Sequence, residues 1–247
     1  MRVQGRDNNN NNNNDYLRQQ NVPTGYDGSS SGGSQADSLT PYVRRHLGQV
    51  YGLLTLGVIS AGLGATLMIA TPLCKVIPPL VPMIGGFIPL LWLSFAPPAN
   101  PNLKLALFFA FTTIEGMALA PLILMTSMKG VLVTSLLLTG AIFCGFSAAA
   151  YLAPRASMVA WQGPLFGALI GLVGISVVNI FWPSAIAHSI ILYGGLALFS
   201  IMIASDTQAM IERARCGAGD HVQDALQMFL NVVNIFVRIA QIMGSQD

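Results

Sequence analysis

The chain carries few charges for its length. Only 9% of its 247 residues are charged, whereas 53% are hydrophobic, and soluble globular domains have about 25% charged residues. This balance excludes two soluble domains and indicates one integral membrane domain, with lipid as its main surrounding. The formal net charge of +2 offers no basic surface for nucleic acid, so we expect no nucleic-acid partner.

Cysteine and histidine are also scarce, with three of each. Cys74, Cys144 and Cys216 fall in a predicted loop, within a predicted span and in a loop on the opposite side. No two of them can pair within one chain, so we expect free thiols. The three histidines are widely separated, which argues against a transition-metal site. We expect no cofactor.

Common enzyme motifs are missing too. The sequence has no His-Glu-x-x-His string and no phosphate-binding loop. Two intramembrane aspartates, Asp206 and Asp224, could suggest an aspartyl protease, but they lie near the membrane edge and lack accompanying glycine motifs. A seven-helix receptor is disfavoured, because the last apolar stretch has no proline kink and no outer disulfide is possible. We therefore expect no enzymatic activity.

The polar residues gather at the N-terminus. Residues 1–43 include the run Asn8–Asn14 and a Ser/Gly stretch at 29–34, which cannot bury a core and predict a disordered tail. No apolar run begins in the first 40 residues, so we expect no cleavable signal peptide. Residues 44–243 form the expected membrane domain, and residues 244–247 a short tail.

Seven apolar stretches of about 20 residues follow, the length needed to cross a bilayer. They predict an all-α bundle of seven transmembrane helices. The second stretch holds four prolines, so we expect it to be kinked, with neighbouring helices satisfying the freed carbonyls. The stretches are residues 50–70, 76–96, 105–125, 130–153, 164–183, 186–214 and 221–243.

The loop charges predict an orientation. With the N-terminus inside, six Lys and Arg residues fall in inner loops and two in outer loops, which favours a cytosolic N-terminus. The side of the C-terminus stays open, since the last stretch could cross or re-enter. The inner residues are Arg44, Arg45, Lys104, Arg155, Arg213 and Arg215, and the outer ones are Lys75 and Lys129.

The last stretch carries a line of polar residues, which we call the polar stripe. Their spacing alternates between four and three residues, which puts them on one face of a helix. Every other residue between Ala225 and Met243 is apolar. Something other than lipid must therefore meet this face. The stripe consists of Asp220, Asp224, Gln227, Asn231, Asn234, Arg238 and Gln241.

Three acids inside the spans are candidates for function, because ionisable groups there are costly. They are Glu115, Asp206 and Asp224. A rise of 1.5 Å per residue puts Asp206 about 12 Å below its helix end, between Asp224 at about 6 Å and Asn231 at about 16 Å on the next helix. Asp206 can thus contact the stripe, although it could serve only to hold the neighbouring helix. Glu115 is either a polar lock between helices or a pathway residue.

Several strings of residues are similar to those of a known family. The most specific is Asp206-Thr207-Gln208 followed by Ile211-Glu212 and Ala214. Together these strings resemble the Bax-inhibitor (transmembrane Bax inhibitor motif) family over about residues 44–243. The supporting strings are His46-Leu47-Gly48-Gln49-Val50-Tyr51, Glu115-Gly116, Leu119-Ala120-Pro121-Leu122, Tyr193-Gly194-Gly195-Leu196 and Phe236-Val237-Arg238-Ile239.

The resemblance implies a seven-helix bundle with the seventh helix at the centre. It also implies a protein of endomembranes, often the endoplasmic reticulum, that leaks Ca²⁺ in a pH-dependent way and dampens cell death. A mitochondrial membrane is the alternative location. The family's pH sensor is a pair of aspartates; Asp206 matches the first, whereas the second falls on Asn231. The family's basic C-terminal tail has no counterpart in residues 244–247.

These observations lead to one functional expectation and one alternative. Carboxylate and amide oxygens are the hard ligands that Ca²⁺ prefers, so the stripe and Asp206 would pass Ca²⁺, with transient binding at Asp206 and Asp224. The alternative is a non-conducting scaffold that binds cell-death regulators of the Bcl-2 type, in which the stripe holds the bundle together or meets a partner helix. The candidate residues for the pathway or for pH sensing are Asp206, Asn231, Asp224, Glu115, Gln227, Asn234 and Arg238.

Overall fold

The structure is a computed structural model that describes residues 39–71, 77–78, 80–95 and 100–245. Within these ranges the regular structure is helical, without a β-strand. Six helical segments are long and apolar enough to cross a membrane, and a shorter apolar one covers Leu80–Phe95. The predicted all-α, polytopic membrane fold is confirmed. The expected disorder before residue 39, and Cys74, lie outside the described residues.

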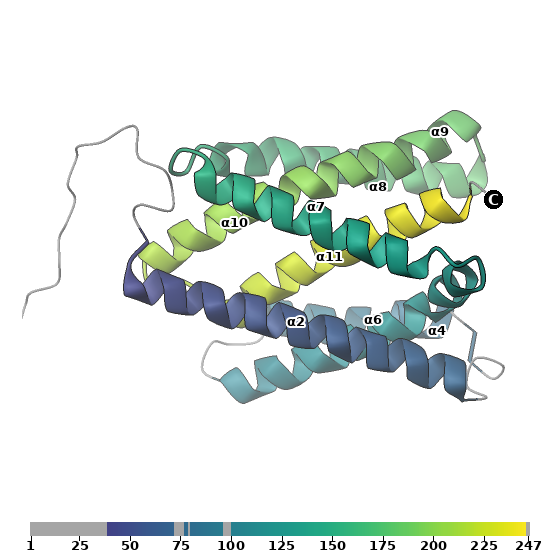
Figure 1. Cartoon of the computed structure of the whole chain (residues 1–247), viewed down its shortest axis with the longest axis horizontal. Coiled ribbons are helices and arrows are strands. Elements are labelled where there is room, and N and C mark those ends of the chain that lie inside the picture. The colour runs from purple at the N-terminus through teal and green to yellow at the C-terminus, as the bar shows by residue number, and fades with distance from the viewer. Residues whose placement is uncertain (1–38, 72–76, 79, 96–99, 246–247) are drawn as a thin grey trace, which may run out of the picture. The chain divides into compact units, whose positions relative to one another are not determined.

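The helices follow one another with short connections (Figure 1). A 3₁₀ turn, Val159–Trp161, precedes α8, and a π-helical turn, Ile190–Gly194, joins α9 to α10. The α-helices are α2 (Pro41–Ala70), α4 (Leu80–Gly85), α5 (Phe87–Phe95), α6 (Pro101–Met128), α7 (Leu132–Leu152), α8 (Gln162–Phe181), α9 (Ala185–Ser189), α10 (Gly195–Arg215) and α11 (His221–Gly244).

The first helix begins at Pro41, well before the predicted start at residue 50. Thr40 caps it, since its hydroxyl accepts a hydrogen bond from the backbone N–H of Val43 at 3.4 Å, and proline is favoured in the first turn. Arg44 and Arg45 in the extra turns are exposed. Val43 and Leu47 are buried, so these turns belong to the bundle rather than to the tail.

The second apolar stretch is broken, as its prolines predict. Its described part consists of α4 and α5, which meet at Gly86. Pro89 has no N–H and cannot donate to the preceding turn. At about 1.5 Å per residue, Leu80–Phe95 is shorter than the roughly 30 Å hydrocarbon core. This segment packs along α6.

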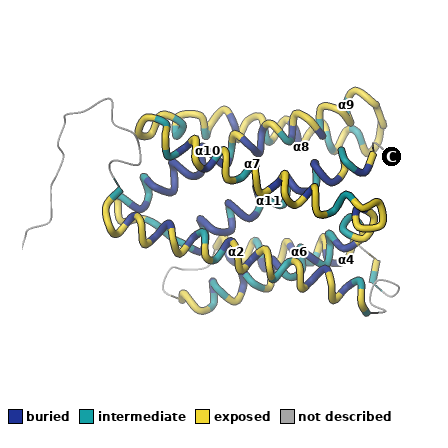
Figure 2. The backbone as a smooth tube through the Cα atoms, viewed as in Figure 1, coloured by how far each residue is buried: buried dark blue, intermediate teal, exposed yellow. Residues whose placement is uncertain are grey.

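The last helix has the central position that was expected, with one refinement. It packs against α2, α6, α7 and α10, and Figure 1 shows it between the α7–α10 side and the α2–α6 side. It also shares a core cluster with α8 through Leu165 and Leu172. The α4–α5 segment instead rests mainly on α6. Figure 2 shows buried residues along α11 and exposed ones along α8, as expected of a lipid-facing helix.

Helices α2 and α6 cross with their backbones nearly in contact. A Cβ atom on Gly64 would lie 2.1 Å from the carbonyl oxygen of Thr113, and one on Gly116 would lie 1.9 Å from that of Ala61. Ser60 and Thr113 share a hydrogen bond of 2.7 Å beside this crossing. Close approach through glycine is a common way to associate helices in membranes, where packing and hydrogen bonds replace the hydrophobic effect.

Candidate ion pathway along the last helix

A tight turn brings α10 and α11 side by side. Gly217 has a φ of +72°, a left-handed conformation that glycine adopts without strain. The N–H groups of Gly217 and Ala218 donate to the carbonyls of Ala214 and Arg213 at 3.1 and 3.0 Å, and so satisfy the end of α10. The polar stripe of α11 therefore runs back along α10.

Asp206 is the polar centre of this hairpin. Its side chain is buried, with a residue exposure of 4%. Gln227 donates its amide N–H to Oδ1 at 2.9 Å, and Asn231 donates to Oδ2 at 2.7 Å. The contact between Asp206 and the stripe is the one that helix geometry predicts. Gln162 of α8 and the charge of Arg213 also act on this carboxylate.

The neighbours of Asp206 in sequence hold a different part of the bundle. Gln208 accepts from the backbone N–H of Met158 at 2.8 Å and donates to the carbonyls of Ala150 and Pro154 at 3.1 and 3.2 Å. Ser205 donates to the carbonyl of Met158 at 3.0 Å. These two residues are three positions apart and share a helix face. Residues 205–208 thus bind the α7–α8 connection through Ser205 and Gln208, and α11 through Asp206.

Asp224 has different partners from those of Asp206. Its Oδ2 lies 2.8 Å from Nε2 of His46, and its Oδ1 accepts from Nη2 of Arg213 at 2.6 Å. Both Asp224 and His46 are buried. From the sequence, Arg213 is predicted only as a loop charge, and no contact is predicted for His46. The spacing of four from Asp220 placed Asp224 on the stripe, but no local pattern pointed to these partners.

Asp220 closes the same end of the bundle. It caps α11 by accepting from the backbone N–H groups of Val222 and Gln223 at 3.1 and 3.3 Å, and it forms an ion pair with Lys104 of α6. Burial alone would raise the pKa of Asp220, but the hydrogen bonds from Lys104, Gln223 and Val222 outweigh it and hold the pKa below its ordinary value. We call the group of His46, Lys104, Arg213, Asp220 and Asp224 the charged end.

The other half of the stripe is organised around Arg238. Asn234 donates to the carbonyl of Leu230 at 2.9 Å, one turn back in its own helix. Arg238 donates from Nη1 to the backbone and side-chain oxygens of Asn234 at 2.9 and 3.0 Å, and its guanidinium lies 4.6 Å from the centre of the Phe199 ring. Gln241, the last member, is exposed.

Glu115 lies apart from the stripe. It is half-buried on α6 and faces the break between α4 and α5, where a Cβ on Gly86 would lie 3.8 Å from its Oε2. No ion pair joins it to another residue of the described chain. The structure therefore does not bring Glu115 together with Asp206 or Asp224.

A cavity of about 430 Å³ adjoins the stripe between α8, α10 and α11. Most of the other side chains around it are apolar. Its polar lining comes from Ser176, Gln227, Asn231, Asn234 and Arg238.

A bundle of spanning helices with a buried carboxylate against a polar stripe defines a polytopic membrane protein with a polar interior. The sequence profile of the family described as "Inhibitor of apoptosis-promoting Bax1" matches residues 43–247. The chain belongs to this family, the Bax inhibitor family.

Characterised relatives agree with this assignment. The chain is 33% identical to Bax inhibitor 1 of Arabidopsis thaliana over 208 residues, which cover 83% of each chain. It is 30% identical to Bax inhibitor 1 of Oryza sativa subsp. japonica over 225 residues, or 87% of this chain and 89% of the relative. Identity to human Bax inhibitor 1 is 27% over 213 residues, which cover 85% of this chain and 89% of the relative.

Proposed function

We propose that this protein suppresses cell death from an intracellular membrane, and that it does so by leaking Ca²⁺ along the polar stripe of α11. The printed names of its relatives, Bax inhibitor 1, and of its family support the first part. The endoplasmic reticulum is the proposed membrane, and a mitochondrial membrane is the alternative. No enzymatic activity forms part of this proposal.

The observation that carries the proposed leak is the setting of Asp206. A carboxylate inside a membrane bundle is costly and marks a functional candidate, and no ion pair joins Asp206 to another described residue. The amides of Gln227 and Asn231 contact it directly. If the helices separate, these groups can turn carboxylate and amide oxygens towards a passing Ca²⁺ ion.

In this proposal the described contacts represent the closed state of the pathway. Asp206 ties α10 to α11 through two charge-assisted hydrogen bonds, which are stronger than neutral ones. At the charged end, Asp224 is held by His46 and Arg213. Opening requires these contacts to loosen. Protonation of Asp206 would remove its charge and weaken its hydrogen bonds, which makes the proposed leak sensitive to pH.

Flux from purified protein tests the proposal. The full-length chain, reconstituted in liposomes that enclose a Ca²⁺ indicator, should pass Ca²⁺ faster than protein-free liposomes of the same composition. Liposomes holding heat-denatured protein control for bilayer damage. A flux equal to that of protein-free liposomes would overturn the proposed Ca²⁺ leak and favour the non-conducting scaffold.

The scaffold is favoured by one observation. Each member of the stripe from Asp220 to Arg238 already has a hydrogen-bond or ion-pair partner inside the bundle. A stripe whose members already have partners could serve only to stabilise the bundle. In that case cell death would be suppressed by binding regulators of the Bcl-2 type, and variants of the stripe would change stability without changing flux.

The proposed orientation places the N-terminus in the cytosol. His46 at the start of α2 contacts Asp224 at the start of α11, and Lys104 at the start of α6 contacts Asp220 just before α11. His46 and Lys104 therefore lie at the same end of the bundle. A variant that keeps only Cys216, which is exposed near this end, should react with a membrane-impermeant thiol reagent from the cytosolic side. A variant that keeps only Cys74 should react from the other side.

A further inference from the structure

Arg238 is a cation without an acidic partner among the described residues. Its Nη1 donates to the backbone and side-chain oxygens of Asn234. Its Nε is buried without an acceptor, and its Nη2 donates to none of the residues described. The ring of Phe199 offsets part of the cost of the charge. A guanidinium inside a membrane normally finds an anion or water.

The position of this guanidinium depends on the absence of a side chain at Gly195 on α10. A Cβ atom on Gly195 would lie 2.1 Å from Nε of Arg238 and 2.9 Å from Cζ. The space for the side chain therefore exists because residue 195 is glycine. Gly195 directly follows the π-helical turn Ile190–Gly194, and such turns often lie at functional sites.

The cavity beside Arg238 has two unlike walls. One wall is polar and comes from α11, including Asn231, Asn234 and Arg238. The other is mostly apolar and comes mainly from α8 and α10, with Leu230 of α11 beside it and the hydroxyl of Ser176 as its one polar group. Its volume of about 430 Å³ falls within the roughly 300–1,000 Å³ of small-molecule pockets. The apolar lining consists of Phe166, Leu169, Leu172, Val173, Phe199, Met202 and Leu230.

The cavity faces the lipid. Phe166 and Val173 at its edge are 62% and 54% exposed on the outer face of α8. The backbone of Arg238 lies six residues before Gly244, the last residue of α11, or about 9 Å from that end at 1.5 Å per residue. Its guanidinium turns back towards Asn234, four residues deeper in the helix. Lys129 donates to the carbonyl of Gly244 and adds a second positive charge at this end. Local thinning of the bilayer and water defects around an intramembrane arginine let a lipid headgroup approach that depth.

We propose that this cleft binds one anionic phospholipid, with its phosphate on Nη2 of Arg238 and an acyl chain along Phe166 and Val173. The apolar wall selects an amphiphile over a free inorganic anion, and the unpaired charge selects an anionic headgroup over a zwitterionic one. Binding does not depend on the proposed Ca²⁺ leak.

A competition experiment tests the proposal. The purified full-length protein in detergent micelles is mixed with equal amounts of phosphatidylglycerol and phosphatidylcholine of different chain length, and retained lipids are counted by native mass spectrometry. One phosphatidylglycerol should be retained in preference. Arg238→Gln should reduce this preference about tenfold, because a charge-assisted hydrogen bond is lost, whereas Arg238→Lys should keep most of it.

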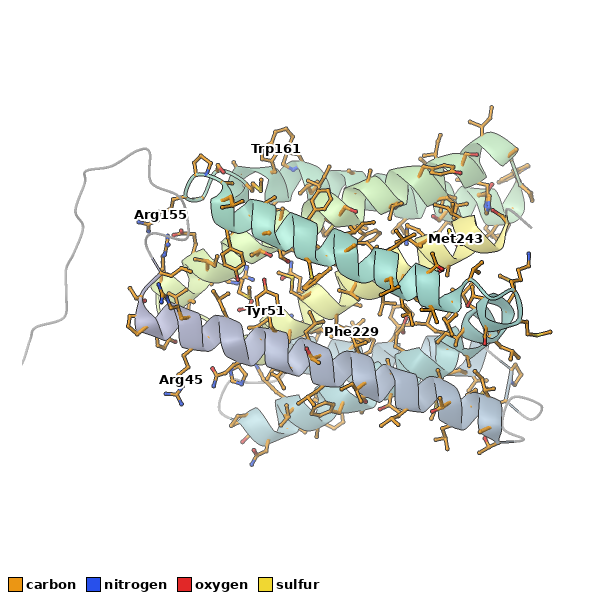
Figure 3. All side chains as sticks on the ribbon, in the orientation of Figure 1. Arg45, Tyr51, Arg155, Trp161, Phe229 and Met243 are labelled. Atoms are coloured by element: carbon orange, nitrogen blue, oxygen red, sulfur yellow. The ribbon has the colours of Figure 1, made fainter. Side chains whose placement is uncertain are left out.

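Two further variants sharpen the test. Val173→Trp fills the lipid-facing side of the cleft and leaves the charge of Arg238 in place, and it should also reduce the preference for phosphatidylglycerol. It decides between the outcomes if Arg238→Gln does not fold. Arg45→Gln removes an exposed charge at the far end of the bundle from Met243 (Figure 3), and it should change nothing.

Three results would overturn the proposal. The first is equal retention of the two lipids by the unaltered protein. The second is an unchanged preference in Arg238→Gln or in Val173→Trp. The third is displacement of phosphatidylglycerol by inorganic phosphate, which would show a site for a free anion. Because the readout is bound lipid, the result does not depend on Ca²⁺ flux. A protein without flux could still retain phosphatidylglycerol, and a conducting protein could fail to retain it.

Discussion

His46 and Asp224 lie 178 positions apart in sequence, and their side chains meet across 2.8 Å in the interior of the bundle. Arg213 holds the second oxygen of the same carboxylate at 2.6 Å. A Cβ atom on Gly219 would lie 2.8 Å from the His46 ring, so the backbone of the α10–α11 turn packs directly on it. One buried carboxylate thus joins the start of α2, the end of α10 and the start of α11.

Replacing His46 with Ala should destabilise the protein by about 1–3 kcal/mol, the cost of leaving a buried polar group short of a partner. Arg213 remains on Asp224 and limits the loss. The measurement is the thermal unfolding midpoint in detergent. His188→Ala is the matched control, because His188 is exposed on α9, and its midpoint should stay close to that of the unaltered protein. Equal losses in the two variants would mean that the buried contact contributes nothing.

The contacts of Asp206 could be predicted from sequence, whereas those of Asp224 could not. Asp206 and the stripe are close in sequence and joined by a short turn, so the rise per residue fixes which side chains come level. His46 reaches Asp224 only through the packing of α2 against α11, and no local spacing encodes that. The sequence likewise gives no helix contacts for Glu115, so its role as a polar lock or as a pathway residue could not be decided. The structure places it beside the α4–α5 break.

Hydropathy predicted the helices better than their ends. The apolar runs are long enough to reveal each span, but the start of α2 carries Arg44 and Arg45, which hide the buried Val43. The π-helical turn at Ile190–Gly194 also has no hydropathy signal. Its effect, the space beside Gly195 for Arg238, becomes visible only when the two helices are packed together.

Gly116→Ala should separate α2 from α6 and destabilise the bundle by about 1–3 kcal/mol, as overpacking does in a tight core. The obstacle is the backbone of Ala61, 1.9 Å from the added Cβ, which cannot move aside as a side chain could. Gly140→Ala on α7 is the control, since nothing lies within 4 Å of its added Cβ. Unfolding midpoints in detergent should fall for the first and not for the second; an unchanged midpoint in Gly116→Ala would refute the close crossing.

Asp206→Ala should change the basal Ca²⁺ leak in liposomes by about tenfold, because two hydrogen bonds to a charged group are lost at once. A faster leak would mean that Asp206 closes the pathway, and a slower one that it binds the passing ion. Val232→Ala, on the opposite side of α11 against an apolar cavity, should cost packing without altering flux. The same change in both variants would make the stripe structural.

The remaining prediction concerns Asn231, which donates to Asp206 at 2.7 Å. An asparagine cannot ionise, so the unaltered pair holds a single carboxylate and should show no shared titration near neutral pH. Asn231→Asp creates two carboxylates within hydrogen-bond distance. When both are charged they repel, and a proton shared between them relieves the repulsion. The variant should therefore gain a pH-dependent change in contact between α10 and α11.

The measurement is Ca²⁺ flux in liposomes between about pH 8 and about pH 5, a range in which a coupled carboxylate pair can release its shared proton. Flux through Asn231→Asp should rise where that proton is lost, because repulsion then pushes the two helices apart. Asp224→Asn should not remove or create such a step, since Asp224 is engaged by His46 and Arg213. If the unaltered protein already shows the step and Asp224→Asn abolishes it, then Asp224, rather than position 231, is the functional partner of Asp206.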